Sequence, residues 1–157
     1  MRKRTTAAAL VLWAGMTAGA AAGPIEELTG YWTGGGTVLL PERVTEKVKC
    51  AVIYKVGGGG TLIKQTIRCA SADYNINAVA ELRVNGSQVA GNWEEKTYSA
   101  TGQVSGRYTG SSFVLSIQGG NFTAAMDLGL TSSCKQTIRI QPKGLEIKRI
   151  TMNLAKC

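Results

Sequence analysis

The sequence predicts an all-β fold, an antiparallel up-and-down barrel of about 8–10 strands. Short segments with alternating apolar and polar residues follow one another, and glycine-rich or Asn-Gly turns separate them. Beyond residue 22, no window shows the apolar period of a helix. The length of 157 residues fits one domain. The expected strands are roughly 31–40, 47–56, 61–70, 75–84, 87–96, 101–108, 111–118, 121–130, 134–141 and 145–154.

The first 22 residues are expected to be a cleaved signal peptide rather than part of the fold. Basic residues at 2–4 precede an apolar stretch over 7–16, and small residues lead to a cleavage site after Ala22. The apolar stretch is shorter than the roughly 20 residues of a membrane-spanning helix. Cleavage would leave a single domain over 23–157 with 15 basic and 10 acidic residues, a net charge of +5 instead of +8. We therefore expect a bacterial protein that is periplasmic or secreted.

The first hairpin turn is expected in the tetraglycine Gly57 to Gly60, which could close loops of several lengths. With Gly59-Gly60 as the turn, apolar residues face one another on a single side of the hairpin. A one-residue slip would move every side chain to the other face. The expected pairs are Val56–Ile63, Tyr54–Gln65, Val52–Ile67 and Cys50–Cys69.

Three later turns give apolar faces in the same way. Asn85-Gly86 and Gly119-Gly120 suit the positive φ angles of two-residue hairpin turns. In the loop 141–144, Pro142 supplies a φ near −65° and Gly144 a positive φ. The expected pairs are Leu82–Val89, Ala80–Gly91 and Ala78–Trp93, then Ile117–Phe122, Leu115–Ala124 and Phe113–Met126, and finally Ile140–Leu145 and Ile138–Ile147.

The four cysteines are expected to form two structural disulfides. Four cysteines allow three pairings. The hairpin register selects Cys50–Cys69, and Cys134–Cys157 follows by elimination. A redox pair or metal site is not favoured, because the chain has no Cys-x-x-Cys and no histidine to complete a ligand set. We expect no metal and no cofactor.

An apolar-x-Gly-x-aromatic pattern occurs three times and ends at Trp32, Trp93 and Tyr108. The glycine allows a strand to bend or another backbone to approach, and the aromatic side chain points to the same side. The aromatic residues could plug barrel corners or line a ligand cavity. Small residues among the inward positions favour a cavity. The candidate ligand-binding residues are Trp32, Trp93, Tyr108, Phe113 and Phe122.

Basic residues gather on the outward positions of the strands near 47–56 and 61–70. Facing residues on an antiparallel ladder lie about 5 Å apart, so these form a cationic stripe. The stripe could serve solubility and discourage edge pairing, or it could contact anionic envelope material such as lipopolysaccharide, acidic lipid or glycan. Nucleic acid is not expected as a partner, since few outward aromatic residues are available for stacking. The stripe comprises Lys47, Lys49, Lys55, Lys64 and Arg68, and a second patch is expected from Lys135, Arg139 and Lys148.

The residue types argue against an enzyme. Without histidine, the chain lacks the Ser-His-Asp and Cys-His arrangements. Glu94 and Glu95 are adjacent on a strand and point to opposite faces. Asp73 and Asp127 have no identifiable acid–base partner. We expect a protein that binds rather than catalyses.

The segment Leu28-Thr29-Gly30-Tyr31-Trp32-Thr33 resembles the Gly-x-Trp start of lipocalins and the opening strand of avidins. In lipocalins a basic residue late in the barrel packs over that tryptophan, which implies this role for Lys148 or Arg149. The ligand-binding pattern of avidins has no match, so biotin binding is not implied. More broadly, the chain resembles small exported alphaproteobacterial proteins of unknown function. The resemblance implies a lipocalin-like barrel, but it does not indicate an activity.

Together these observations predict an exported, non-enzymatic protein that holds a small apolar ligand in its barrel. The alternative is a cationic envelope protein that binds anionic lipid or glycan through its outer surface. No transmembrane span is expected, and the sequence leaves the oligomeric state open.

Overall fold

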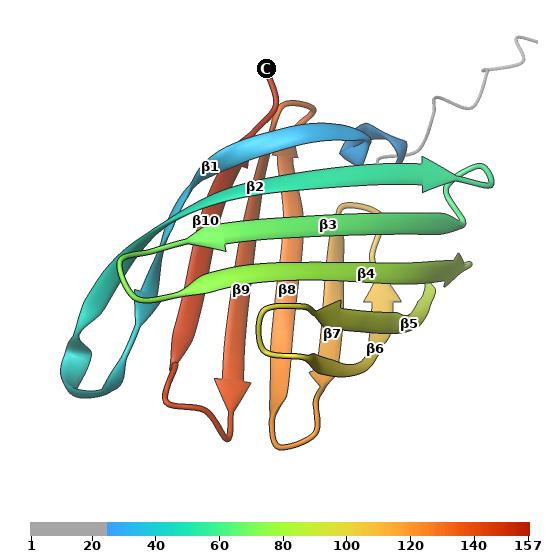
Figure 1. Ribbon diagram of the computed structural model, residues 1–157. Helices are drawn as coiled ribbons and strands as arrows, with labels where there is room; N and C mark the ends of the chain where they lie inside the picture. The colour runs from blue at the N-terminus through green and yellow to red at the C-terminus, as the bar shows by residue number, and fades with distance from the viewer. Residues whose placement is uncertain (1–24) are drawn as a thin grey trace, which may run out of the picture.

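The computed structural model describes residues 25–157. They form a closed barrel of ten antiparallel strands in which neighbours in sequence are neighbours in space and β10 pairs with β1 (Figure 1). The prediction of an all-β, up-and-down barrel is therefore confirmed. The expected signal peptide at 1–22 and its boundary lie outside the described residues. The strands are β1 (Gly30–Leu39), β2 (Thr45–Gly57), β3 (Leu62–Ala70), β4 (Asn75–Asn85), β5 (Gln88–Glu95), β6 (Ala100–Tyr108), β7 (Ser112–Gln118), β8 (Thr123–Ser132), β9 (Lys135–Lys143) and β10 (Arg149–Ala155).

The barrel has two ends that differ in what covers them. The 3₁₀ helix η1 (Glu26–Leu28) leads into β1 at one end, where the β2–β3, β4–β5, β6–β7 and β8–β9 turns and the C-terminus also lie; we call this the capped end. The opposite end, which we call the mouth, carries the 3₁₀ helix η2 (Pro41–Arg43) and the other turns. In Figure 1, β1 to β4 pass in front of β8 to β10 at a steep angle. Neither helix in residues 25–157 is long and apolar enough to cross a membrane.

The β2–β3 hairpin has the predicted register. Val52 faces Ile67, Tyr54 faces Gln65, and Cys50 faces Cys69 across the tetraglycine turn. Both predicted disulfides, Cys50–Cys69 and Cys134–Cys157, are present. The first is buried on the inner face of the wall, and the second ties the C-terminus to the β8–β9 turn.

Two other hairpins have the predicted faces but a register shifted by two residues. Leu82 faces Gly91 instead of Val89, since Asn85 stays in the ladder opposite Gln88 and the turn begins at Gly86. In the β7–β8 hairpin, Leu115 likewise faces Met126 instead of Ala124. Here the Gly119 amide donates to the Phe122 carbonyl at 2.9 Å, so the turn moves on to Gly120-Asn121. An even shift keeps each side chain on its predicted face.

The predicted register of the last hairpin is wrong. Ile140 faces Ile150 instead of Leu145, and β10 begins only at Arg149. The strand starts late because the Lys148 amide donates to the Leu39 carbonyl of β1 at 2.8 Å, which docks the connecting loop on the neighbouring strand first. The shift is odd, so the inward residues of β10 are the even-numbered ones.

The glycines of the apolar-x-Gly-x-aromatic pattern stand where backbones need space. A β-carbon on Gly91 would lie 2.0 Å from the Glu81 carbonyl oxygen, and one on Gly106 would lie 2.2 Å from that of Val114. Gly106 also has a φ of +154°, and Gly30 one of +132°. These positions exclude larger residues because the strands bend sharply and approach closely there, which supports the interpretation of the pattern as barrel corners.

Candidate functional site

The inward side chains near the capped end are buried against one another. Trp32 is fully buried, and its indole nitrogen donates to the Leu28 carbonyl at 2.7 Å, so η1 closes this end over the ring. Tyr108 and Phe113 also belong to this end, with ring centroids 4.7 Å apart. Burial, and after it the charge of Glu27 on η1, raises the pKa of Tyr108. The capped half is thus a filled core.

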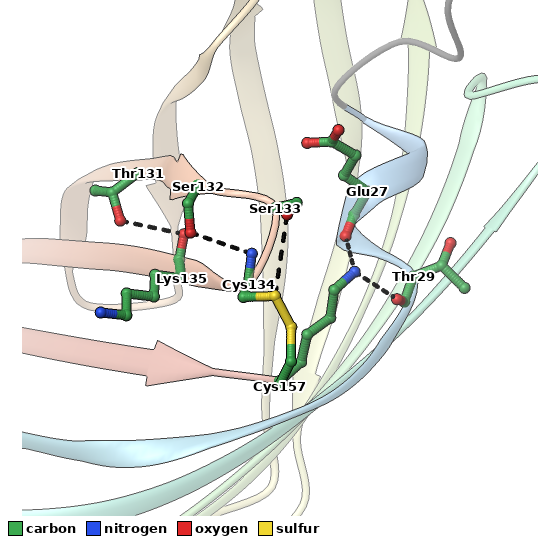
Figure 2. The surroundings of a disulfide bond; sticks show 9 residues. Glu27, Thr29, Thr131, Ser132, Ser133, Cys134, Lys135 and Cys157 are labelled. Carbon is green, nitrogen blue, oxygen red and sulfur yellow. Dashed lines mark hydrogen bonds between the residues drawn. A yellow bond between two sulfur atoms is a disulfide. The ribbon is translucent and has the colours of Figure 1, made fainter.

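A basic residue covers Trp32, but it is neither Lys148 nor Arg149. The Nζ atom of Lys156 lies 4.9 Å from the ring centroid. It also donates to the backbone carbonyl of Glu27 and, at 3.2 Å, to that of Thr29. Lys148 and Arg149 lie at the mouth end of β10, the far end from Trp32. Figure 2 shows how the Cys134–Cys157 disulfide holds the C-terminus beside Glu27 and Thr29.

Toward the mouth, several inward apolar side chains are only partly buried, although Val38 and Val48 at this end are buried. They follow the same alternation as the buried residues deeper in each strand, so they point toward the barrel interior. Between them stand the small residues Ala78, Ala80, Ala100 and Gly102, which are also partly exposed. An apolar molecule seated here would remove apolar surface from water, at about 25 cal/mol per Å². We call these partly exposed residues the mouth ring: Ile67, Ile76, Trp93, Ile117, Ile140 and Ile150.

The structure divides the predicted ligand-binding aromatic residues between the two ends. Trp93 belongs to the mouth ring, and its ring centroid lies 5.7 Å from that of Phe122 at the start of β8. The indole nitrogen of Trp93 donates to the Gln118 carbonyl at 3.1 Å, which fixes the ring orientation. Trp32, Tyr108 and Phe113 lie in the capped half. The five residues therefore do not form one wall.

A polar cluster is buried inside the barrel. Gln65 Nε2 donates to the Tyr54 hydroxyl at 3.0 Å, and this hydroxyl donates to Gln136 Oε1 at 2.9 Å. Burial raises the pKa of Tyr54 well above its ordinary value, and its hydrogen bonds to Gln65 and Gln136 lower it only in part, so the phenol stays neutral and donates. Gln136 is 1% exposed. Its buried Nε2 has no hydrogen-bond partner within residues 25–157.

An unpaired buried donor is rare in folded proteins and costs about 1–3 kcal/mol. This cluster was not among the residues predicted from the sequence. The predicted register already placed Gln65 opposite Tyr54 on the inner face, and a polar side chain at an inward position was the available signal. Gln136 lies on β9, which pairs with neither β2 nor β3, so no hairpin register brings it to Tyr54.

Glu95 stands at the mouth end of β5 and organises the next turn. Its carboxylate accepts hydrogen bonds from the backbone amides of Asn77 at 2.8 Å, Thr97 at 3.1 Å and Tyr98 at 2.6 Å. Burial acts to raise the pKa of Glu95, but these hydrogen bonds outweigh it and hold the pKa below its ordinary value. The carboxylate is thus occupied with the backbone.

The five basic residues of the cationic stripe are all exposed, as predicted. Lys55 faces Lys64, and the Nζ atom of Lys64 lies 3.7 Å from Glu81 Oε1, the one salt bridge in the described part of the chain. A shallow hollow of about 540 Å³ lies beside Lys49 and Arg68. A second hollow, of about 680 Å³, follows the outer face of β3 to β6.

The expected second basic patch does not form. Lys135 begins β9 at the capped end, whereas Lys148 lies in the loop at the mouth. Arg139 faces Asp127 of β8, so an acidic side chain interrupts the basic surface there. The prediction failed because it assumed a tight turn after Ile140, which would have kept Lys148 close to Arg139.

Comparison with known proteins identifies the fold. No family model and no curated protein matches the chain. Rv2717c from M. tuberculosis aligns with 85% of this chain and 94% of its own, at 14% identity and a TM-score of 0.68. The S-type phycobiliprotein lyase CPES from Guillardia theta covers 85% and 90%, at 10% identity and a TM-score of 0.61. The redesigned β-barrel mFAP1, bound to DFHBI, covers 85% and 98%, at 12% identity and a TM-score of 0.51.

At these identities the likeness shows a shared lipocalin-like barrel and nothing finer. The resemblance to alphaproteobacterial exported proteins gains no support, since no family matches. That part remains a prediction.

Proposed function

We propose that this chain is an exported, non-enzymatic binding protein that holds a small, mainly apolar ligand at the mouth of its barrel. The observation that carries the proposal is the contrast along the barrel axis. Most inward apolar side chains of the capped half are buried, whereas those of the mouth ring are partly exposed. Barrels of this size can hold one small ligand, and a partly exposed apolar ring is where such a ligand gains contact.

Trp93 and Phe122 are the proposed aromatic contacts of the ligand. They adjoin each other at the mouth, and the residues that face Trp93 on the neighbouring strands, Ala80 and Gly102, are small. Aromatic rings supply large apolar contact areas. Trp32, Tyr108 and Phe113 are proposed to support the capped core instead. The redesigned barrel mFAP1, solved with DFHBI, provides an example of a similar barrel with a bound small molecule.

The assignment as a non-enzymatic protein rests on the state of the acidic residues. Glu95 is engaged by three backbone amides, and Asp127 faces Arg139 on the outer surface. Within residues 25–157, no group of three or more His, Cys, Asp or Glu side chains could hold a metal ion. Export is supported by the two disulfides, since disulfides persist in oxidising compartments.

Titration with the neutral fluorescent probe 1-aminoanthracene tests ligand binding. We expect probe fluorescence to rise on binding to the mature protein, and Trp93→Ala to weaken this binding by roughly tenfold, as for loss of an aromatic contact. Tyr31→Ala is the matched control, because Tyr31 is 59% exposed on the outer face. Failure of both the probe and native mass spectrometry to find any bound or bindable small molecule would contradict the proposal.

A second candidate function is binding of anionic envelope material through the cationic stripe. The observation in its favour is that Lys64 alone among the five residues of the stripe has an acidic partner in the described chain. We expect binding to vesicles of phosphatidylglycerol that weakens with salt and is lost on reversing the charges at Lys47, Lys49, Lys64 and Arg68. Reversal of Lys143 and Lys148 is the control. Binding that survives reversal of the stripe charges excludes this function.

A further inference from the structure

We propose that the buried amide of Gln136 is the hydrogen-bond donor that recognises the ligand, and that the ligand is an apolar molecule carrying one neutral acceptor such as a ketone, ester or amide carbonyl. This inference rests on the proposed function and adds the chemical class of the ligand. The donor is Gln136 Nε2, the buried nitrogen that has no partner within residues 25–157.

The hydrogen bonds of the cluster determine which group is free. Gln65 donates to the Tyr54 hydroxyl, and the hydroxyl donates to Gln136 Oε1. The carbonyl side of the Gln136 amide is therefore occupied, and its N–H₂ side is not. A free N–H₂ group requires an acceptor, which excludes an ammonium group; a carbonyl oxygen, which only accepts, leaves no further buried donor to satisfy.

The charge of the cluster selects a neutral acceptor. Tyr54, Gln65 and Gln136 are all uncharged, and all are at least nine-tenths buried. An ionised carboxylate brought to this position would lose its hydration and find no positive partner among the three. Burying an unpaired charge is far more costly than burying a hydrogen-bonded neutral carbonyl.

The position of Gln136 relates this donor to the mouth ring. Ile140 of the mouth ring lies four residues further along β9 on the same inner face, roughly 13 Å away at the rise of an extended strand. Two methionines stand beside this path: Met152 faces Ile138, and Met126 faces Ile140. Both methionines and Ile138 are buried, so a chain that extends from the mouth ring to Gln136 must displace their side chains. Unbranched methionine side chains change shape readily, which makes this displacement feasible.

Displacement of 1-aminoanthracene by three ten-carbon compounds tests the inference: 2-decanone, decane and ionised decanoic acid. For the mature protein we expect 2-decanone to displace the probe at roughly tenfold lower concentration than decane, the ratio for one net hydrogen bond. Decanoic acid at neutral pH should be weaker than 2-decanone. In Gln136→Met the preference for the ketone over decane should disappear while decane binding stays unchanged.

Two further measurements separate recognition from folding. Gln141→Met is the matched control, since Gln141 lies on the same strand but is exposed; it should keep the ketone preference. The infrared carbonyl band of ¹³C-labelled 2-decanone should shift to lower frequency on binding to the parent protein. This shift should be absent when the ketone binds to Gln136→Met. The thermal midpoint of Gln136→Met without ligand should stay close to that of the parent, because the change removes one unpaired buried donor, Gln136 Nε2, and leaves another, the Tyr54 hydroxyl.

The outcomes distinguish the two proposals. If neither the probe nor any small molecule binds the parent protein, the proposed function fails. If the probe binds but none of the three compounds displaces it, the role of Gln136 is overturned. If 2-decanone and decane bind equally, or if the ketone preference survives in Gln136→Met, the role of Gln136 is overturned while ligand binding stands. Stronger binding of decanoic acid than of 2-decanone contradicts the neutral acceptor. An ordered water as the only partner of Gln136 would give equal binding and no infrared shift.

Discussion

The two halves of this barrel are built from the same strands, yet they differ in what fills them. In the capped half, Trp32 lies under η1, and Lys156 and the Cys134–Cys157 disulfide close the wall around it. At the mouth, isoleucines and Trp93 point into the same interior without full cover. One alternating pattern thus serves two purposes: stability is concentrated where the interior is sealed, and binding is proposed where it is not.

The largest expected effect tests the capped half. Trp32→Ala removes the most deeply buried aromatic side chain and the hydrogen bond to Leu28, so the free energy of unfolding should fall by about 3–5 kcal/mol. Urea denaturation followed by circular dichroism measures the loss. A loss below about 1 kcal/mol would show that the capped half is not the stable core.

Removal of the second disulfide should have the next largest effect. Cys134→Ser with Cys157→Ser releases the C-terminus that carries Lys156, and the free energy of unfolding should fall by about 2–4 kcal/mol. Denaturation under non-reducing conditions measures it. Reduction should abolish the difference between parent and variant, because it opens the Cys134–Cys157 bond of the parent. Reduction also opens Cys50–Cys69, so a double variant at Cys50 and Cys69 measures that contribution separately. Equal stability of parent and variant would contradict the anchoring role.

A smaller, pH-dependent effect is expected at the mouth. Glu95→Gln removes the negative charge of a carboxylate that accepts hydrogen bonds from three backbone amides. The free energy of unfolding should fall by roughly 1–3 kcal/mol at neutral pH. The pKa of Glu95 is lowered in the folded state, so its contribution is present above the pKa of the unfolded chain and is lost as pH falls through the folded pKa. The free energies of unfolding of parent and variant, measured by denaturation, should converge as the pH is lowered. If the difference in stability persists at the lowest pH, it arises from packing and not from the charge of Glu95. Glu94→Gln, on the outer face, is the control.

The smallest stability effect is expected for Trp93→Ala. Because Trp93 is partly exposed, its removal should reduce the free energy of unfolding by about 1 kcal/mol or less, well below the loss for Trp32→Ala. Its effect on probe binding should exceed its effect on stability. Equal losses of stability for the two tryptophan variants would remove the distinction between the halves.

Much of the fold could be predicted from turn chemistry and alternation. With Gly59-Gly60 taken as the turn, apolar alternation predicted the β2–β3 register and with it the Cys50–Cys69 pair. Two other turns were misplaced by one residue each, which shifts the register by two residues and leaves the faces intact. The last hairpin could not be predicted, since its loop is set by the hydrogen bond from Lys148 to Leu39, a contact distant in sequence.

The candidate site was predicted less completely than the fold. Alternation tells which side chains point inward, but it does not tell how high each one sits along the barrel axis. Trp32 and Trp93 therefore shared a predicted wall although they lie toward opposite ends. The bond from Tyr54 to Gln136 joins strands that are not neighbours, so it follows from closure of the barrel and from no local pattern.

The pairing of β1 with β10 also constrains when the barrel can form. The edge of β1 has no partner until the last strand is available, so closure must wait for nearly the whole described chain. Contacts between residues so far apart in sequence are slow to form, and an open strand edge invites pairing with other molecules in the meantime. The middle of β1 consists of three consecutive glycines, Gly34 to Gly36, between Thr33 and Thr37. They present this waiting edge with little apolar side-chain surface, which lowers the risk of aggregation before closure.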